Sequence, residues 1–159
     1  MSFSGYTLPV NPPDAPLRLT TEQLFAGLKT KARDPLAFVP MITSCAVLEE
    51  HPDGLLREVV LKGKPGPVHE RVEYFPSGNV VFTMLDPATG DKLGVITNTI
   101  TETPEGELML TFTFTFGQGG PWGSGPASDE QRKERDKLVV DTMRRTLEVT
   151  RQYVQEKKI

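Results

Sequence analysis

Residues 108–116, Leu-Met-Leu-Thr-Phe-Thr-Phe-Thr-Phe, say more about the fold of this chain than any other stretch of its sequence. Apolar side chains occupy every second position from residue 108, and threonine fills the positions between them from residue 111 onward. Side chains of a β-strand alternate between the two faces of its sheet, so this period of two predicts a strand. One face of that strand should meet a core and the other should meet water.

The region before this strand is divided into short runs by clusters of glycine, proline, asparagine and aspartate. Proline presets φ and glycine supplies positive φ, and tight turns need both. Loops this short can join only antiparallel neighbours. The sequence therefore predicts an antiparallel meander over 43–116, preceded by a first strand over 3–10. The six strands of the meander are expected at 43–50, 55–62, 67–75, 79–86, 92–102 and 107–116.

Two further segments have the apolar spacing of helices. The first begins with a capping box of Thr20 and Gln23 and meets Pro35, and a further turn can follow, so helices are predicted over 20–41. Its apolar stripe consists of Leu24, Phe25, Leu28 and Ala32. The second follows a capping box at Ser128 and contains neither glycine nor proline, which predicts a long C-terminal helix over 129–157.

These elements predict one α+β domain over residues 1–159, in which a seven-stranded antiparallel sheet wraps around the C-terminal helix. Eight phenylalanines and one tryptophan cannot fill the space between such a sheet and one helix. We therefore expect a cavity between them, which is the usual place for a ligand.

A glycine-rich loop over 117–127 joins the last strand to the C-terminal helix. Its spacing does not fit a phosphate-binding loop, because Trp122 stands where glycine is required. We interpret the loop as a mobile segment at the mouth of the cavity, with Trp122 as a lid. The alternative is a plain flexible linker.

Composition excludes several classes of protein. The chain has 159 residues and a net charge of −3, so it lacks the basic face that nucleic acid requires. No apolar run is long enough for membrane insertion. The only cysteine, Cys45, excludes an internal disulfide, and the two histidines stand too far apart to favour a metal site. We expect a cytoplasmic protein with no signal peptide, metal or cofactor, whose oligomeric state the sequence does not indicate.

Short motifs along the whole chain resemble one family. They lie at 6–11, 19–28, 38–40, 45–50, 57–59, 98–100 and 110–114. Together they are similar to the AtaL-like family, a branch of the START and Bet v 1 superfamily. The resemblance implies a helix-grip fold with a hydrophobic cavity, in a family whose fungal members include proteins encoded among genes for secondary metabolites.

Strand alternation provides the candidate residues of the cavity. If the apolar members of each strand face inward, Arg57, Glu70, Tyr74 and Asn98 face inward with them. A carboxylate that faces an apolar cavity must pair with a cation or take up a proton. We interpret Glu70 as a catalytic acid or base and Arg57 as the anchor of an enolate or carboxylate. The alternative is a structural ion pair, or a register that exposes both residues.

The other candidates would bind the substrate. Tyr74 and Asn98 are expected to donate hydrogen bonds to a ligand carbonyl, although Asn98 could instead bind a neighbouring loop. His69 is expected to face solvent. The remaining candidates are Phe82, Phe112, Phe114, Trp122, Met143 and Tyr153, and for Tyr153 a packing role is favoured over a place in the cavity.

The preferred interpretation of the function is binding of a small, largely apolar molecule by a cofactor-free cyclase, isomerase or pericyclase of specialised, polyketide-like metabolism. Shape alone can accelerate a ring closure by restricting conformers. The alternative is a non-catalytic carrier, which needs few inward ionisable groups, whereas an acid–base enzyme needs at least one with a perturbed pKa. A structural adaptor would have a filled cavity.

Overall fold

The computed structural model describes residues 2–123 and 125–159, so Ser124 of the glycine-rich loop lies outside the described residues, as does Met1. Two helices and seven strands follow one another along the chain. They are β1 (Ser2–Pro9), α1 (Thr21–Arg33), β2 (Ile42–His51), β3 (Gly54–Leu61), β4 (Pro67–Phe75), β5 (Asn79–Leu85), β6 (Lys92–Glu102), β7 (Leu108–Phe116) and α2 (Asp129–Gln155). The predicted α+β fold with a seven-stranded sheet and a long C-terminal helix is confirmed.

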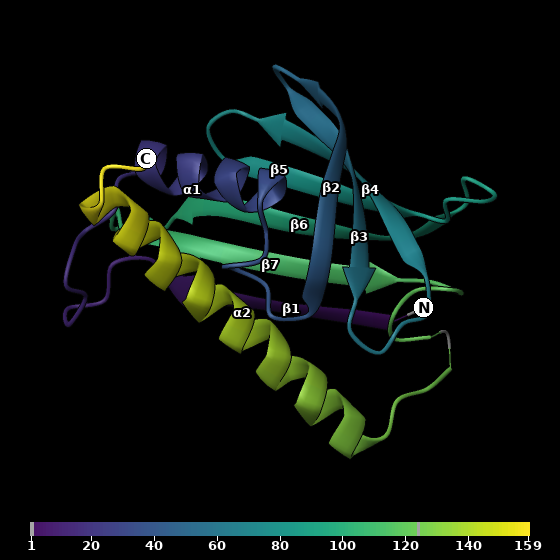
Figure 1. Cartoon of the computed structure of the whole chain (residues 1–159). Helices are drawn as coiled ribbons and strands as arrows, with labels where there is room; N and C mark the ends of the chain where they lie inside the picture. Colours follow the sequence, from purple (N-terminus) through teal and green to yellow (C-terminus); the bar gives the residue numbers. More distant parts are fainter. Residues whose placement is uncertain (1, 124) are drawn as a thin grey trace.

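The seven strands form one sheet in the order β1-β7-β6-β5-β4-β3-β2, in which every neighbouring pair is antiparallel. Strands β2 to β7 are a continuous meander, and β1 joins the free edge of β7. Figure 1 shows the sheet curving behind the two helices. Helix α1 lies against β5 and β6, and α2 lies against β1 and β7.

The register of the sheet decides which side chains face the helices. Arg57 pairs with Glu70 across β3 and β4, and Glu70 pairs with Met84 across β4 and β5. Two further residues, Asn98 and Phe112, pair across β6 and β7. All five are buried, because alternate positions of neighbouring strands share the covered face of the sheet.

The threonines of β6 and β7 lie on the opposite face. Thr97 and Thr113 join their hydroxyl groups by a hydrogen bond, and Thr7 and Thr111 do the same. This places the apolar positions of β7 toward the helices, as the alternation at 108–116 predicted.

Helix α1 is shorter than the predicted helical region. Its capping box of Thr20 and Gln23 is present, but the helix ends at Arg33. After it, the carbonyl of Pro35 accepts hydrogen bonds from the amides of Phe38 and Val39, which makes a turn and not the second helix expected up to residue 41. Proline disfavours helical backbone at the residue before it, so the first helix stops at this point.

Helix α2 carries hydroxyl groups on its buried stripe. The side chains of Thr142, Thr146 and Thr150 each donate a hydrogen bond to the backbone carbonyl four residues earlier. These bonds satisfy the hydroxyl groups inside the helix, so threonine can occupy core positions. The helix ends at Gln155, two residues before the predicted end.

The buried apolar residues form two clusters. The larger joins both helices to the central strands and includes Leu28, Phe112 and Met143. The smaller joins the other ends of β3 to β7 and includes Met84 and Phe116. None of the described helices is long and apolar enough to span a membrane.

Candidate functional site

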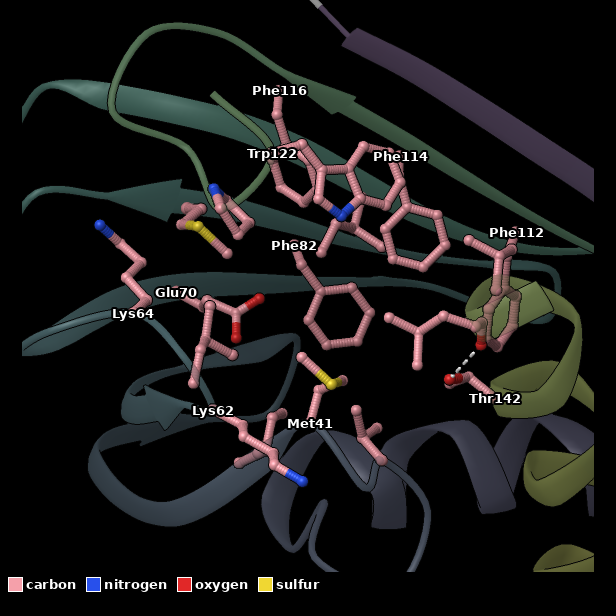
Figure 2. A pocket seen from close by; sticks show the side chains of 18 of the residues that line it. Met41, Lys62, Lys64, Glu70, Phe82, Phe112, Phe114, Phe116, Trp122 and Thr142 are labelled. Carbon is pink, nitrogen blue, oxygen red and sulfur yellow. Dashed lines mark hydrogen bonds between the residues drawn. The ribbon is translucent and has the colours of Figure 1, made fainter. Parts of the chain in front are cut away.

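Residues of both apolar clusters line a cavity of about 180 Å³. Its wall is mainly apolar, and its aromatic members are Phe82, Phe112, Phe114, Phe116 and Trp122. Figure 2 shows Phe82 near the middle of the pocket, with Trp122, Phe114 and Phe116 on one side of it and Glu70 on another. Exposed residues of the wall mark the mouth, where Lys62 in the β3–β4 loop and Pro121 before α2 meet solvent.

An ion pair lies at the wall of this cavity. Nη2 of Arg57 is 3.0 Å from Oε1 of Glu70, and the two residues are only 3% and 2% exposed. The hydrogen bond from Arg57 engages Oε1 of Glu70 and leaves Oε2 out of the pair. That oxygen is the free acceptor of a carboxylate whose orientation is fixed by a charge-assisted hydrogen bond.

Arg57 also holds the end of α1. Its Nη1 lies 2.7 Å from the carbonyl oxygen of Ala32 and 3.3 Å from that of Lys31. The last carbonyls of a helix have no partner within the helix and carry partial negative charge, so a guanidinium is well suited to them. Arg57 therefore fixes the last turn of α1 relative to Glu70.

Lys31 is the charged residue that the sequence analysis missed. It extends from the last turn of α1 into the cavity wall and is 6% exposed. Its Nζ lies 2.7 Å from Oδ1 of Asn98 and faces the rings of Phe112 and Phe82, at 4.6 and 5.1 Å from their centroids. Leu24, Leu28 and Lys31 follow one another at helical spacing, which was the available signal.

Burial lowers the pKa of Lys31 from 10.5 to about 7. The nearby charge of Arg57 is a smaller part of this lowering, and the charge of Glu70 partly opposes it. Two cations and one carboxylate therefore share a poorly hydrated site, and the amine of Lys31 can gain or lose its proton near neutral pH.

The two predicted ligand donors are both buried. Asn98 is fully buried and binds Lys31 through Oδ1, so its alternative role as a partner of a loop backbone is wrong. Its Nδ2, the hydroxyl of Tyr74 and Nε of Arg57 are buried without hydrogen-bond partners among the described residues. Burial also raises the pKa of Tyr74, which keeps this hydroxyl a donor. Neither Tyr74 nor Asn98 forms part of the cavity wall itself.

Trp122 lies at the mouth of the cavity. Its ring is 4.9 Å from the ring of Phe116 and 5.7 Å from that of Phe114. Arg135 of α2 stacks over the outer side at 5.3 Å and donates a hydrogen bond to the carbonyl of Trp122. The indole thus joins the cavity wall, where Figure 2 shows it beside both phenylalanines.

Two candidates from α2 lie elsewhere. Met143 is fully buried in the larger apolar cluster, outside the cavity wall. Tyr153 packs edge-on against Phe38 at a centroid distance of 5.7 Å, also outside the wall. The cavity wall instead takes Leu138, Val139 and Thr142 from the first half of α2.

The histidines stand apart from the cavity. His69 lies 2.9 Å from Oε2 of Glu58, its cross-strand partner on the outer face of β3 and β4. Within residues 2–123 and 125–159, no group of three or more histidine, cysteine, aspartate or glutamate side chains could hold a metal ion.

The fold and the family can now be compared with known proteins. The family model described as "Acetylaranotin biosynthesis cluster protein L", named AtaL, matches residues 4–157. The chain belongs to the AtaL family. The resemblance inferred from the short motifs of the sequence is thereby confirmed. No curated protein matches the chain.

Solved structures of Bet v 1-like proteins share the fold of this AtaL family member. The Zhui aromatase/cyclase from Streptomyces sp. R1128 is 14% identical with a TM-score of 0.61, over 96% of this chain and 95% of that one. Ara h 8.0201 is 12% identical with a TM-score of 0.53, over 94% and 98% of the two chains. The di-domain ARO/CYC BexL is 15% identical with a TM-score of 0.56, over 94% of this chain and 48% of its own.

Proposed function

We propose that this protein binds a small, largely apolar carbonyl compound in its cavity and transfers a proton on it, as a cofactor-independent cyclase or isomerase of specialised metabolism. The observation that carries the proposal is Glu70, a buried carboxylate held by Arg57 at the wall of an otherwise apolar cavity. A binding cavity alone needs no such group, whereas removal of a proton beside a carbonyl needs a positioned base.

The chemistry follows from the three charged residues. Glu70 would take the proton through Oε2, because Oε1 is engaged by Arg57. Lys31, in its protonated form, would stabilise the negative oxygen that develops on the substrate carbonyl. Arg57 touches both the carboxylate and the helix that carries Lys31, so it is a positioning residue.

The comparisons support the same class of function without assigning a reaction. The AtaL family is described by a biosynthesis cluster, and two of the similar folds belong to aromatase/cyclase proteins. Cyclisation and aromatisation of a carbonyl-rich chain proceed through enolates, which the Glu70 and Lys31 pair is suited to form.

The test uses 2-tetralone, a two-ring ketone with acidic hydrogens beside its carbonyl. Trp122, the only tryptophan, lies in the cavity wall, so its fluorescence should report binding of this probe. Nuclear magnetic resonance in heavy water should then show that the protein accelerates exchange of the hydrogens beside the carbonyl. Glu70→Gln should lower that rate by about a hundredfold or more, the usual worth of a positioned base.

A matched control separates a local effect from a general one. Glu73→Gln changes an exposed carboxylate on the same strand and should leave the exchange rate unchanged. Binding of 2-tetralone without accelerated exchange would favour the carrier. A protein that neither binds the ketone nor exchanges its hydrogens would overturn the proposal.

A further inference from the structure

On the basis of the proposed function, we infer that the natural ligand of this cavity is an organic monoanion, an apolar molecule whose single acidic oxygen group binds beside Lys31 between Phe82 and Phe112. The proposed function leaves the charge of the ligand open. The inference rests on charge balance, on unpaired donors and on the residues at the mouth.

The buried charges of the cavity do not cancel. Arg57 and Glu70 form a pair, which leaves Lys31 without a carboxylate of its own. Among the described residues, its ammonium has one hydrogen bond, to the neutral side-chain oxygen of Asn98. A buried cation without a counter-charge is unfavourable, and a bound anion would supply that counter-charge.

The hydrogen-bonding groups around Lys31 also favour an acceptor. Nδ2 of Asn98 belongs to the same amide that binds Lys31, although Asn98 lies behind the cavity wall, whereas Arg57 lines it. This Nδ2 is buried without a partner, as is Nε of Arg57. Buried donors in native proteins nearly always have partners, and an oxyanion offers several acceptor sites at one place.

The charged side chains at the mouth of the cavity are positive, as Lys31 is. Lys62 and Lys64, both in the loop between β3 and β4, belong to the wall at the side where it opens to solvent. Figure 2 shows both side chains among those that line the pocket. Clefts lined by one sign of charge attract ligands of the opposite sign and raise their rate of association.

The aromatic rings offer a competing partner for the ammonium. Phe82 and Phe112 face Nζ of Lys31, and Phe82 also faces the guanidinium of Arg57 at 5.1 Å. Contacts between cations and ring faces stabilise the charged form without any ligand. The experiment must therefore separate an anion site from an ammonium that the rings already satisfy.

The number of protons taken up on binding distinguishes an anion site from an ammonium that the rings already stabilise. The charged groups that face Lys31 are Arg57 on β3 and Glu70 on β4, whereas α2 contributes only Leu138, Val139 and Thr142 to the same wall. With a pKa of about 7, Lys31 is mostly neutral at pH 8 in the free protein. An anion bound beside it would raise that pKa, so binding at pH 8 should take up most of one proton.

The probes are 2-naphthoate and 2-naphthamide, which have the same shape and differ in charge. Isothermal titration calorimetry at pH 8, in two buffers of different ionisation enthalpy, gives the affinity and the number of protons taken up. We expect 2-naphthoate to bind at least tenfold more tightly than 2-naphthamide and to take up most of one proton. Its affinity should fall by up to about tenfold per pH unit above pH 7.

Two lysine variants test whether the preference for the anion and the proton uptake depend on Lys31. Lys31→Met keeps the length of the side chain and should remove both the preference for the anion and the proton uptake. Lys29→Met is the matched control, since Lys29 lies on the same helix against Phe25 and outside the cavity wall. It should behave as the parent protein does.

Each outcome has a distinct meaning. Equal or tighter binding of 2-naphthamide without proton uptake would overturn the anion inference and leave the proposed function standing. A preference for 2-naphthoate that survives Lys31→Met would also overturn it, because the lysines of the mouth would then be responsible. Loss of 2-tetralone exchange alone would contradict the proposed function but not the anion site.

Discussion

The clearest consequence of the buried amine is that the stability of the protein should depend on pH through Lys31. Below pH 7 this side chain is protonated in both the folded and the unfolded chain. Between pH 7 and 10.5 the unfolded chain keeps the proton and the folded chain releases it. The unfolded state then binds more protons, so the free energy of unfolding rises with pH in this window.

The size of the effect follows from the two pKa values. The folded value of about 7 and the ordinary value of 10.5 differ by roughly 3.5 units, and each unit corresponds to about 1.4 kcal/mol. Lys31→Met removes this dependence, so the variant should be more stable than the parent at pH 6, by up to about 5 kcal/mol. The difference should shrink by about 1.4 kcal/mol for each pH unit above 7.

Urea denaturation followed by circular dichroism at several pH values from 6 to 10 measures this difference. Lys31→Met also loses the hydrogen bond to Asn98, and because the titrating amine is its donor, the pH dependence of that bond is already part of the Lys31 pKa. Lys29→Met, on the same helix, should give a difference that does not change with pH. A constant difference between parent and Lys31→Met would show that Phe82 and Phe112 keep the ammonium charged, and the reasoning from burial would be wrong.

Three further predictions concern other parts of the molecule. Arg57→Met removes the ion-pair partner of Glu70 and leaves only Lys31 nearby, so it should cost about 3–5 kcal/mol in urea denaturation, whereas the double variant Arg57→Met/Glu70→Leu should recover most of it. An equal loss in both variants would argue against a desolvated pair. Gly27→Ala should cost about 1–3 kcal/mol, since its added Cβ would lie 2.4 Å from Oγ1 of Thr150, and Thr150→Ala should restore part of the loss if this close approach is the cause. Residues 117–123 around Trp122 should exchange amide hydrogens rapidly in the free protein and more slowly with 2-naphthoate; slow exchange without ligand would refute the lid.

The strands could be predicted closely because their boundaries depend on local chemistry. Turn clusters such as 86–90 and 103–106 mark strand ends in the sequence, and the structure ends β5 at Leu85 and β6 at Glu102. The alternation of Leu110 and Phe112 with threonine decided the buried face of β7 without knowledge of any neighbour. Local signals therefore carry most of this fold.

The site was only partly predictable, because local signals do not show which side chains meet across the fold. Glu70 and Arg57 could be paired from strand alternation, since both lie among apolar residues of period two. Lys31 was missed because the stripe of α1 was drawn from apolar residues alone, although Lys31 follows Leu24 and Leu28 at helical spacing. Whether a lysine at such a position is buried depends on what crosses the helix, and here Phe82, Phe112 and Asn98 come from three distant strands.

The three buried charges differ in what they imply about function. Arg57 and Glu70 nearly cancel, and Arg57 also binds the end of α1, so this pair has a structural reason to exist even without a ligand. Lys31 has only the neutral oxygen of Asn98 and the rings of Phe82 and Phe112 as partners. Its burial lowers its pKa to about 7, which means that the folded protein is less stable than it would be with an uncharged side chain at that position. A residue that lowers stability while it faces a cavity is better explained by its interaction with a ligand than by a role in the fold. Lys31 therefore indicates a functional cavity more strongly than the Arg57–Glu70 pair does.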